Sequence, residues 1–96
     1  MLVDRRILNI ARTKMDDALT LLMDLRARMQ RQHSVRIYTG TVATFDQIVI
    51  EIDFADWTEM EAFWSNAETN PEVAAFFVKW EKVALPGGKR ELWETV

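Results

Sequence analysis

The sequence predicts an α+β fold, in which four strands form one antiparallel sheet and the helices pack on one side of it. Two observations lead to this prediction. Apolar and polar residues alternate over several short segments, as in strands, and apolar residues recur at intervals of three and four between them, as in helices. Ninety-six residues with only three Gly and two Pro fit a single domain over residues 1–96.

The N-terminal part predicts a strand, a helix and a second strand. Residues 3–11 carry apolar side chains in both alternating sets, so this strand is expected to be at least partly buried on both faces. Thr13 is expected to cap a helix over about 14–32, which begins with acidic residues and ends with basic ones. The next strand, 35–42, is expected to bend near Gly40.

A third strand follows after a short turn, so it should pair with the second as a hairpin. Its alternating apolar residues are Ile48, Ile50, Ile52 and Phe54. Thr58 and Glu61 fit a capping box at the start of the next helix. Asp56 and Glu59 offer an alternative start two residues earlier, and both remain open.

The second helical region is expected to be broken. Pro71 suits the first turn of a new helix with Asn70 as its cap, and apolar residues then recur as far as Ala84. A turn at Leu85–Gly88 precedes a last strand over 89–96. The order strand, helix, strand, strand, broken helix, strand is the βαββαβ plan of a ferredoxin-like sandwich.

Composition disfavours several classes of function. Without cysteine, the chain has no disulfide framework and no thiolate-held zinc or iron–sulfur site. Residues 1–36 hold eight basic and four acidic side chains, whereas residues 37–96 hold four basic and eleven acidic ones. The aromatic side chains lie in the second, acidic part, so basic and aromatic residues are not interleaved, which argues against nucleic-acid binding. No signal-peptide pattern or long apolar stretch is present, so we expect a cytoplasmic protein with no membrane partner.

One face of the predicted sheet has no helix to cover it. A chain this short gains little stability from its own core. Because the strands carry apolar residues on both faces, we expect a homodimer whose sheets pack face to face and close into a barrel.

The C-terminal half resembles the dimeric α+β barrel superfamily, and within it the NIPSNAP-like and antibiotic-biosynthesis-monooxygenase-like small proteins. The segments that carry the resemblance are Phe54-x-x-Trp57, Met60-Glu61-x-Phe63-Trp64, Asn70-Pro71-Glu72, Phe76-Phe77-x-Lys79-Trp80 and Gly87-Gly88-Lys89-Arg90-Glu91-Leu92-Trp93. The resemblance implies the ferredoxin-like fold. It leaves the activity open, because relatives include cofactor-independent monooxygenases, haem-degrading enzymes, lactone isomerases and proteins of no known activity.

His33 is the only histidine, so a site with several histidine ligands is excluded. It is interpreted as a surface residue beside the helix C-terminus, or alternatively as an axial haem ligand or a general base. Haem-degrading relatives carry their ligand histidine in the second helical region, which has none here, so haem is not expected.

Two carboxylates, Glu51 and Asp53, share one face of their strand. They are expected to form a charge ladder with Arg36 or Arg5 on neighbouring strands, or alternatively to share a proton or a cation. Two carboxylates are too few for a metal site, and we expect neither a metal nor a cofactor.

The resemblance also implies a substrate cleft. Cofactor-independent oxygenases of this superfamily use Asn and Trp, often with Tyr or Arg, to bind a phenolic substrate. The catalytic candidates are therefore Asn9, which would orient the substrate, and Tyr38 or His33, which would move a proton. The aromatic residues around the expected cleft between sheet and broken helix are the ligand-binding candidates: Trp57, Trp64, Phe77 and Trp80. The alternative for all of these side chains is ordinary packing.

Three functions remain open. The first is binding of a small apolar or aromatic molecule in the cleft by a homodimer. The second is cofactor-independent oxygenation of an electron-rich aromatic, and the third is a non-catalytic assembly subunit. The residue pattern does not decide whether the chain is an enzyme.

Overall fold

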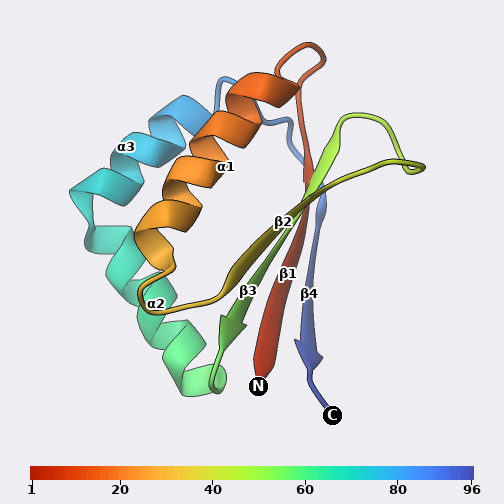
Figure 1. Ribbon diagram of the computed structural model, residues 1–96. Coiled ribbons are helices and arrows are strands. Elements are labelled where there is room, and N and C mark those ends of the chain that lie inside the picture. Colours follow the sequence, from red (N-terminus) through yellow and green to blue (C-terminus); the bar gives the residue numbers. More distant parts are fainter.

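The computed structural model describes all 96 residues as one sheet with helices on one face of it (Figure 1). The elements in chain order are β1 (Leu2–Asn9), α1 (Met15–Met29), β2 (Val35–Thr39), β3 (Gln47–Phe54), α2 (Trp57–Thr69), α3 (Pro71–Trp80) and β4 (Lys89–Glu94). The predicted α+β ferredoxin-like fold is therefore confirmed. No helix is both long and apolar enough to span a membrane.

The sheet has the strand order β2-β3-β1-β4, and all neighbouring strands are antiparallel. In the centre, Leu2 pairs with Phe54 and Asn9 pairs with Gln47. This register places even-numbered residues of β1 and β3 on the face that the helices cover and odd-numbered residues on the open face.

The core lies between the sheet and the helices. The predicted alternation of β3 is confirmed, because Ile48, Ile50, Ile52 and Phe54 are all buried. They belong to a cluster of 12 buried hydrophobic residues, to which the helices add Ala18, Leu22, Met29 and Met60. Burial of this face, at about 25 cal/mol per Å² of apolar surface, is the main source of the fold's stability.

Several predicted elements end at other residues in the structure: β1 ends at Asn9 rather than at residue 11, and β4 ends at Glu94 rather than at residue 96. Thr13 does not cap α1, because its backbone has a φ of 73°, and the N-cap is Lys14 without a side-chain hydrogen bond. The helix ends at Met29 rather than near residue 32. The strand β2 ends at Thr39, so the expected continuation beyond a bend near Gly40 is wrong.

The helix α2 begins at the earlier of the two starts left open by the sequence. Asp56 is its N-cap and accepts a hydrogen bond from the amide of Glu59 at 2.8 Å. The carboxylate of Glu59 in turn accepts from the amide of Ala55, so the box is displaced by two residues from Thr58 and Glu61. The predicted break is confirmed, with Asn70 accepting from the amide of Glu72 at 2.8 Å.

The predicted turn before β4 is also confirmed. Gly88 has a φ of +92°, and a Cβ at this position would collide with the carbonyl oxygen of Ile7 on the neighbouring strand. Only glycine satisfies both constraints.

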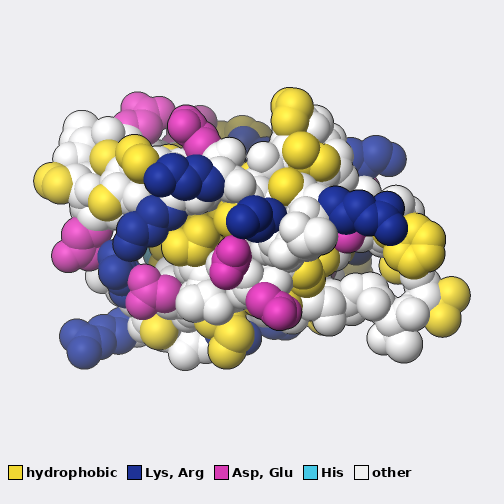
Figure 2. All heavy atoms as spheres, turned by 90° about the horizontal axis from the view of Figure 1, so that it is seen from above, with side chains coloured by type: hydrophobic (Ala, Val, Ile, Leu, Met, Phe, Trp, Pro, Cys, Tyr) yellow, Lys and Arg dark blue, Asp and Glu magenta, His cyan; other side chains and the backbone are white.

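On the upper end of the molecule, basic, acidic and hydrophobic side chains are interspersed (Figure 2). Acidic side chains lie next to the basic ones on this face.

Because the capping box lies at Asp56 and Glu59, substitutions at Asp56 and Thr58 should change the free energy of unfolding by different amounts. Asp56→Ala should lower the free energy of unfolding by about 1 kcal/mol, because it removes the side-chain acceptor of the N-cap. The control Thr58→Ala should change it by less than about 0.5 kcal/mol, because Thr58 makes no capping hydrogen bond. Urea denaturation measures both values, and a larger loss for Thr58→Ala would place the helix start at the later position.

Candidate functional site

An apolar pocket lies between the sheet and all three helices. It is lined by 14 residues, of which 13 are hydrophobic, and has a volume of about 100 Å³. Its floor includes Leu8 and Ile50 from the sheet, and its aromatic walls come from Trp64, Phe77 and Trp80 on α2 and α3. The one polar residue of the lining is Arg6.

A buried carboxylate, which is unusual in a hydrophobic core, lies next to the pocket. Asp4 on β1 has no exposed surface, although its face of the sheet is otherwise largely apolar. Its carboxylate accepts from Nε1 of Trp64 at 3.1 Å and from Nε and Nη2 of Arg90 at 3.1 and 3.0 Å. Arg6 approaches the same carboxylate at 3.5 Å and stacks over the ring of Trp64, 4.1 Å from its centroid. We call Asp4, Arg6, Arg90 and Trp64 the Asp4 cluster.

The Asp4 cluster keeps its carboxylate ionised. Burial raises the pKa of Asp4, but hydrogen bonds from Arg90 and the positive charges of Arg6 and Arg90 outweigh burial and hold the pKa below that of an ordinary aspartate. A buried carboxylate is tolerated when donors surround it, and here two guanidinium groups and an indole N–H do so.

A groove outside the pocket continues it toward solvent. The groove has a volume of about 420 Å³ and shares Arg6, Trp64 and Phe77 with the pocket. Arg90 and Glu68 line its outer part. Together they form one cleft, which we call the aromatic cleft, with an apolar interior and a charged mouth.

His33 lies in a second groove of about 490 Å³, between α1 and α2. Its interpretation as a surface residue is wrong, since only 8% of it is exposed. After α1 the chain turns inward, and the imidazole packs against the rings of Phe54 and Phe63 at 4.8 and 5.3 Å. Its Nδ1 is 3.9 Å from Oε1 of Glu59, beyond hydrogen-bond distance.

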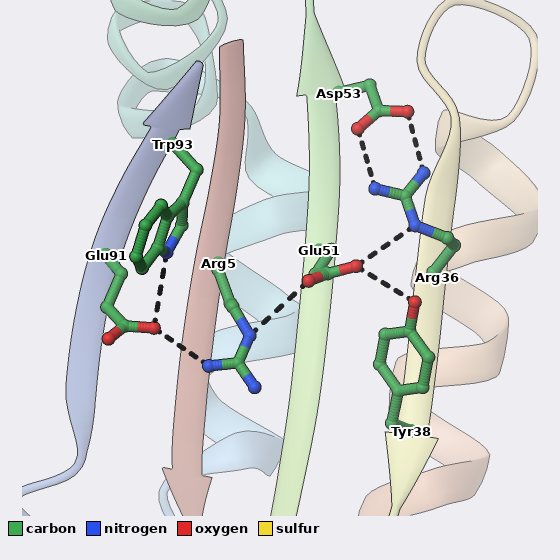
Figure 3. Close-up of polar contacts among 7 residues, drawn as sticks. All are labelled: Arg5, Arg36, Tyr38, Glu51, Asp53, Glu91 and Trp93. Atoms are coloured by element: carbon green, nitrogen blue, oxygen red, sulfur yellow. Dashed lines mark hydrogen bonds and ion pairs between the residues drawn. The ribbon is translucent and has the colours of Figure 1, made fainter. Parts of the chain in front are cut away.

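The open face of the sheet carries a row of alternating charges (Figure 3). The guanidinium group of Arg5 lies 2.8 Å from the carboxylate of Glu91 and 3.4 Å from that of Glu51. The guanidinium group of Arg36 lies 3.1 Å from the carboxylate of Glu51 and 2.7 Å from that of Asp53. We call these five residues the charge ladder. It confirms the prediction that Glu51 and Asp53 pair with arginines.

The charge ladder explains three shifted pKa values. The hydrogen bonds of Arg36 lower the pKa of Asp53 despite some burial, and those of Asp53 and Glu51 raise the pKa of Arg36. Hydrogen bonds from Arg5 and Trp93 lower the pKa of Glu91. No group of three or more His, Cys, Asp and Glu side chains is arranged to hold a metal ion.

The structure does not bring the three catalytic candidates together. Tyr38 lies on the open face and donates to Glu51 at 2.9 Å. Asn9 lies on the same face, where it accepts from Gln47 at 3.0 Å. His33 lies on the helix side of the sheet, so a common site for the three is not formed within one subunit, and their catalytic role stays a prediction.

Three of the four binding candidates line the aromatic cleft: Trp64, Phe77 and Trp80. Trp57 does not, because it lies in the first turn of α2, half exposed, and donates to Glu61 at 2.8 Å. Sequence reasoning missed the Asp4 cluster. Its signal is the position of Asp4 and Arg6 in the same alternating set as Leu2 and Leu8.

Comparisons with solved structures test the resemblance at the level of the fold. A NIPSNAP domain protein from Burkholderia xenovorans superposes with a TM-score of 0.86 at 18% sequence identity, covering 100% of this chain and 95% of that one. The fold is that of the NIPSNAP domain proteins. A NIPSNAP family protein from Agrobacterium tumefaciens strain C58 superposes with a TM-score of 0.83 at 13% sequence identity, covering 99% of this chain and 85% of that one.

An antibiotic biosynthesis monooxygenase also shares the fold, with a TM-score of 0.76 at 14% identity over 100% of this chain and 99% of that one. No protein-family model and no curated protein matches this sequence. The recognised resemblance is therefore confirmed for the fold, which several kinds of activity can share.

The Asp4 cluster predicts a pH-dependent loss of stability. Asp4→Ala should lower the free energy of unfolding by roughly 3 kcal/mol at neutral pH, because it breaks a buried ion pair. This value is at the low end for such a substitution, since both guanidinium groups stay partly exposed. The folded pKa of Asp4 lies below its unfolded value. Its contribution is therefore complete above about pH 4 and is lost as the pH falls through the folded pKa.

Denaturant unfolding at neutral and acidic pH measures this effect. The gap between the wild type and Asp4→Ala should shrink on acidification, and a gap that stays constant would contradict the assignment. The control is Asp17→Ala, which removes an exposed aspartate of α1 and should cost less than about 1 kcal/mol.

Proposed function

We propose that this protein binds a small, mainly apolar or aromatic molecule in the aromatic cleft, and that it does so as a homodimer. The observation that carries the proposal is the lining of the pocket, 13 of whose 14 residues are hydrophobic. Small-molecule sites commonly combine such a lining with a few polar groups that orient the ligand. Here the polar group at the pocket is Arg6.

The dimensions of the aromatic cleft suit a small ligand. Its interior of about 100 Å³ is of the order needed for one aromatic ring, and the outer groove adds room for a substituent. Phe77 is about half exposed, so a ligand would gain apolar burial by covering it.

The open sheet face is the proposed dimer interface. Val49 at its centre is flanked by Ile7 on β1 and Tyr38 on β2, and more than half of Trp93 on β4 is exposed. The charge ladder pairs its own charges within the subunit, so a second sheet can approach without leaving a carboxylate or guanidinium unpaired. Two-fold packing of this face on itself would cover the side that the helices leave open.

Cofactor-independent oxygenation of an aromatic is the second candidate. One observation favours it: the imidazole of His33 is nearly buried, forms no hydrogen bond with another side chain, and lines a groove that shares Met29 and Phe63 with the aromatic cleft. An imidazole in that position can take a proton from a phenolic substrate. Consumption of O₂ that requires both the substrate and His33 would support this candidate.

Filling the aromatic cleft tests the proposed binding. Benzyl alcohol at millimolar concentration should shift the amide resonances of α2 and α3 beside the cleft. Ala67→Leu places extra atoms in a position that lines both the pocket and the groove, and should weaken binding at least about tenfold. The control Ser65→Leu adds the same side chain at an exposed position of α2 outside the cleft.

Binding that is equal in the two variants would contradict the proposed site. A chain that binds no apolar fragment, yet remains a dimer, would instead favour the assembly subunit.

The dimer has its own test. Val49→Glu introduces a charge at the centre of the open face and should weaken self-association at least about a hundredfold, because the carboxylate would be buried without a partner. Val78→Glu, on the exposed side of α3, should leave self-association unchanged. Sedimentation equilibrium compares the two, and a monomeric wild type would overturn the proposed interface.

A further inference from the structure

We infer that the ligand of the aromatic cleft carries one anionic group, a carboxylate attached directly to its apolar body, which Arg6 and Arg90 bind at the mouth of the cleft. This inference rests on the proposed function and specifies the class of ligand. Three features of the Asp4 cluster carry it: its charge, its unused hydrogen-bond donors and its position.

The charge of the cluster is unbalanced. Asp4 supplies one negative charge and the two arginines supply two positive charges, so the cluster has an excess of one positive charge. Asp4 cannot be reached by a ligand, because it has no exposed surface. The side chains of Arg6 and Arg90 are 29% and 45% exposed, so the excess charge faces the groove.

Both guanidinium groups have N–H donors that form no hydrogen bond within the protein. Arg90 uses Nε and Nη2 for Asp4, and Arg6 uses the same two atoms at the longer distance of 3.5 Å. Nη1 of each side chain donates to no group of the protein. A carboxylate with two oxygens matches such paired donors, and charge-assisted hydrogen bonds of this kind are stronger than neutral ones.

Position links these donors to the apolar interior. Arg6 lines both the pocket and the groove, and it stacks on Trp64, which also lines both. A ring held between Trp64 and Phe77 would therefore place its substituent beside the two arginines. The apolar walls of the pocket have a low dielectric constant, so the attraction between an anionic substituent and the two arginines is stronger there than in bulk water.

One acidic side chain lines the same groove. Glu68 is exposed on α2 and forms no ion pair with either arginine, so water weakens the effect of its charge at the mouth of the cleft. Asp4 acts here as a positioning residue, since it holds both guanidinium groups at the mouth of the cleft.

The experiment compares two probes of nearly equal shape, benzoate and its neutral isostere benzamide, by NMR titration of the intact protein at low salt. Benzoate should bind at least about tenfold more tightly, and Arg90→Gln should abolish most of this preference. Arg90→Lys, which keeps the charge, should retain part of it. Glu68→Gln should strengthen benzoate binding slightly, and Arg31→Gln, outside the cleft, should change nothing.

The outcomes separate this inference from the proposed function. Equal binding of the two probes in the aromatic cleft would overturn the anionic ligand while supporting the apolar site. Binding of neither probe would overturn both. Inorganic phosphate should not compete with benzoate, because it lacks the apolar body, and effective competition by phosphate would show an unspecific anion site and overturn the inference.

Discussion

The ion pairs of Asp4 with Arg6 and Arg90 are the constraint on which the arrangement of the helix side depends. A carboxylate without exposed surface is stable there only if donors surround it, so α2 must direct the indole N–H of Trp64 toward the sheet. The two arginines lie at the mouth of the groove, where both side chains stay partly exposed. The aromatic cleft opens beside these charged groups, and its interior lies between the sheet and the helices.

Strand periodicity predicts most of the fold. The alternation of β3 and the break at Asn70 and Pro71 each have a local physical cause, and both are confirmed. The errors lie at the ends of elements, where local signals compete. Thr13 has the side chain of a cap but a left-handed backbone, and of two equivalent capping boxes the structure uses the one at Asp56.

The candidate site was less predictable because it depends on which face of a strand is covered. Arg5 and Arg6 are adjacent in sequence, yet one belongs to the charge ladder on the open face and the other to the Asp4 cluster under the helices. Residue type identified the aromatic walls of the cleft. It could not place His33 in the interior, since that depends on Phe54 and Phe63 from distant segments.

A crystal structure of the protein as purified from cells, without added ligand, tests this account most directly. We expect electron density for a small molecule in the aromatic cleft, with its body between Trp64 and Phe77 and its acidic group beside Arg6 and Arg90. A cleft closed by the side chains of α3, with both arginines turned to solvent and Asp4 left without them, would contradict it.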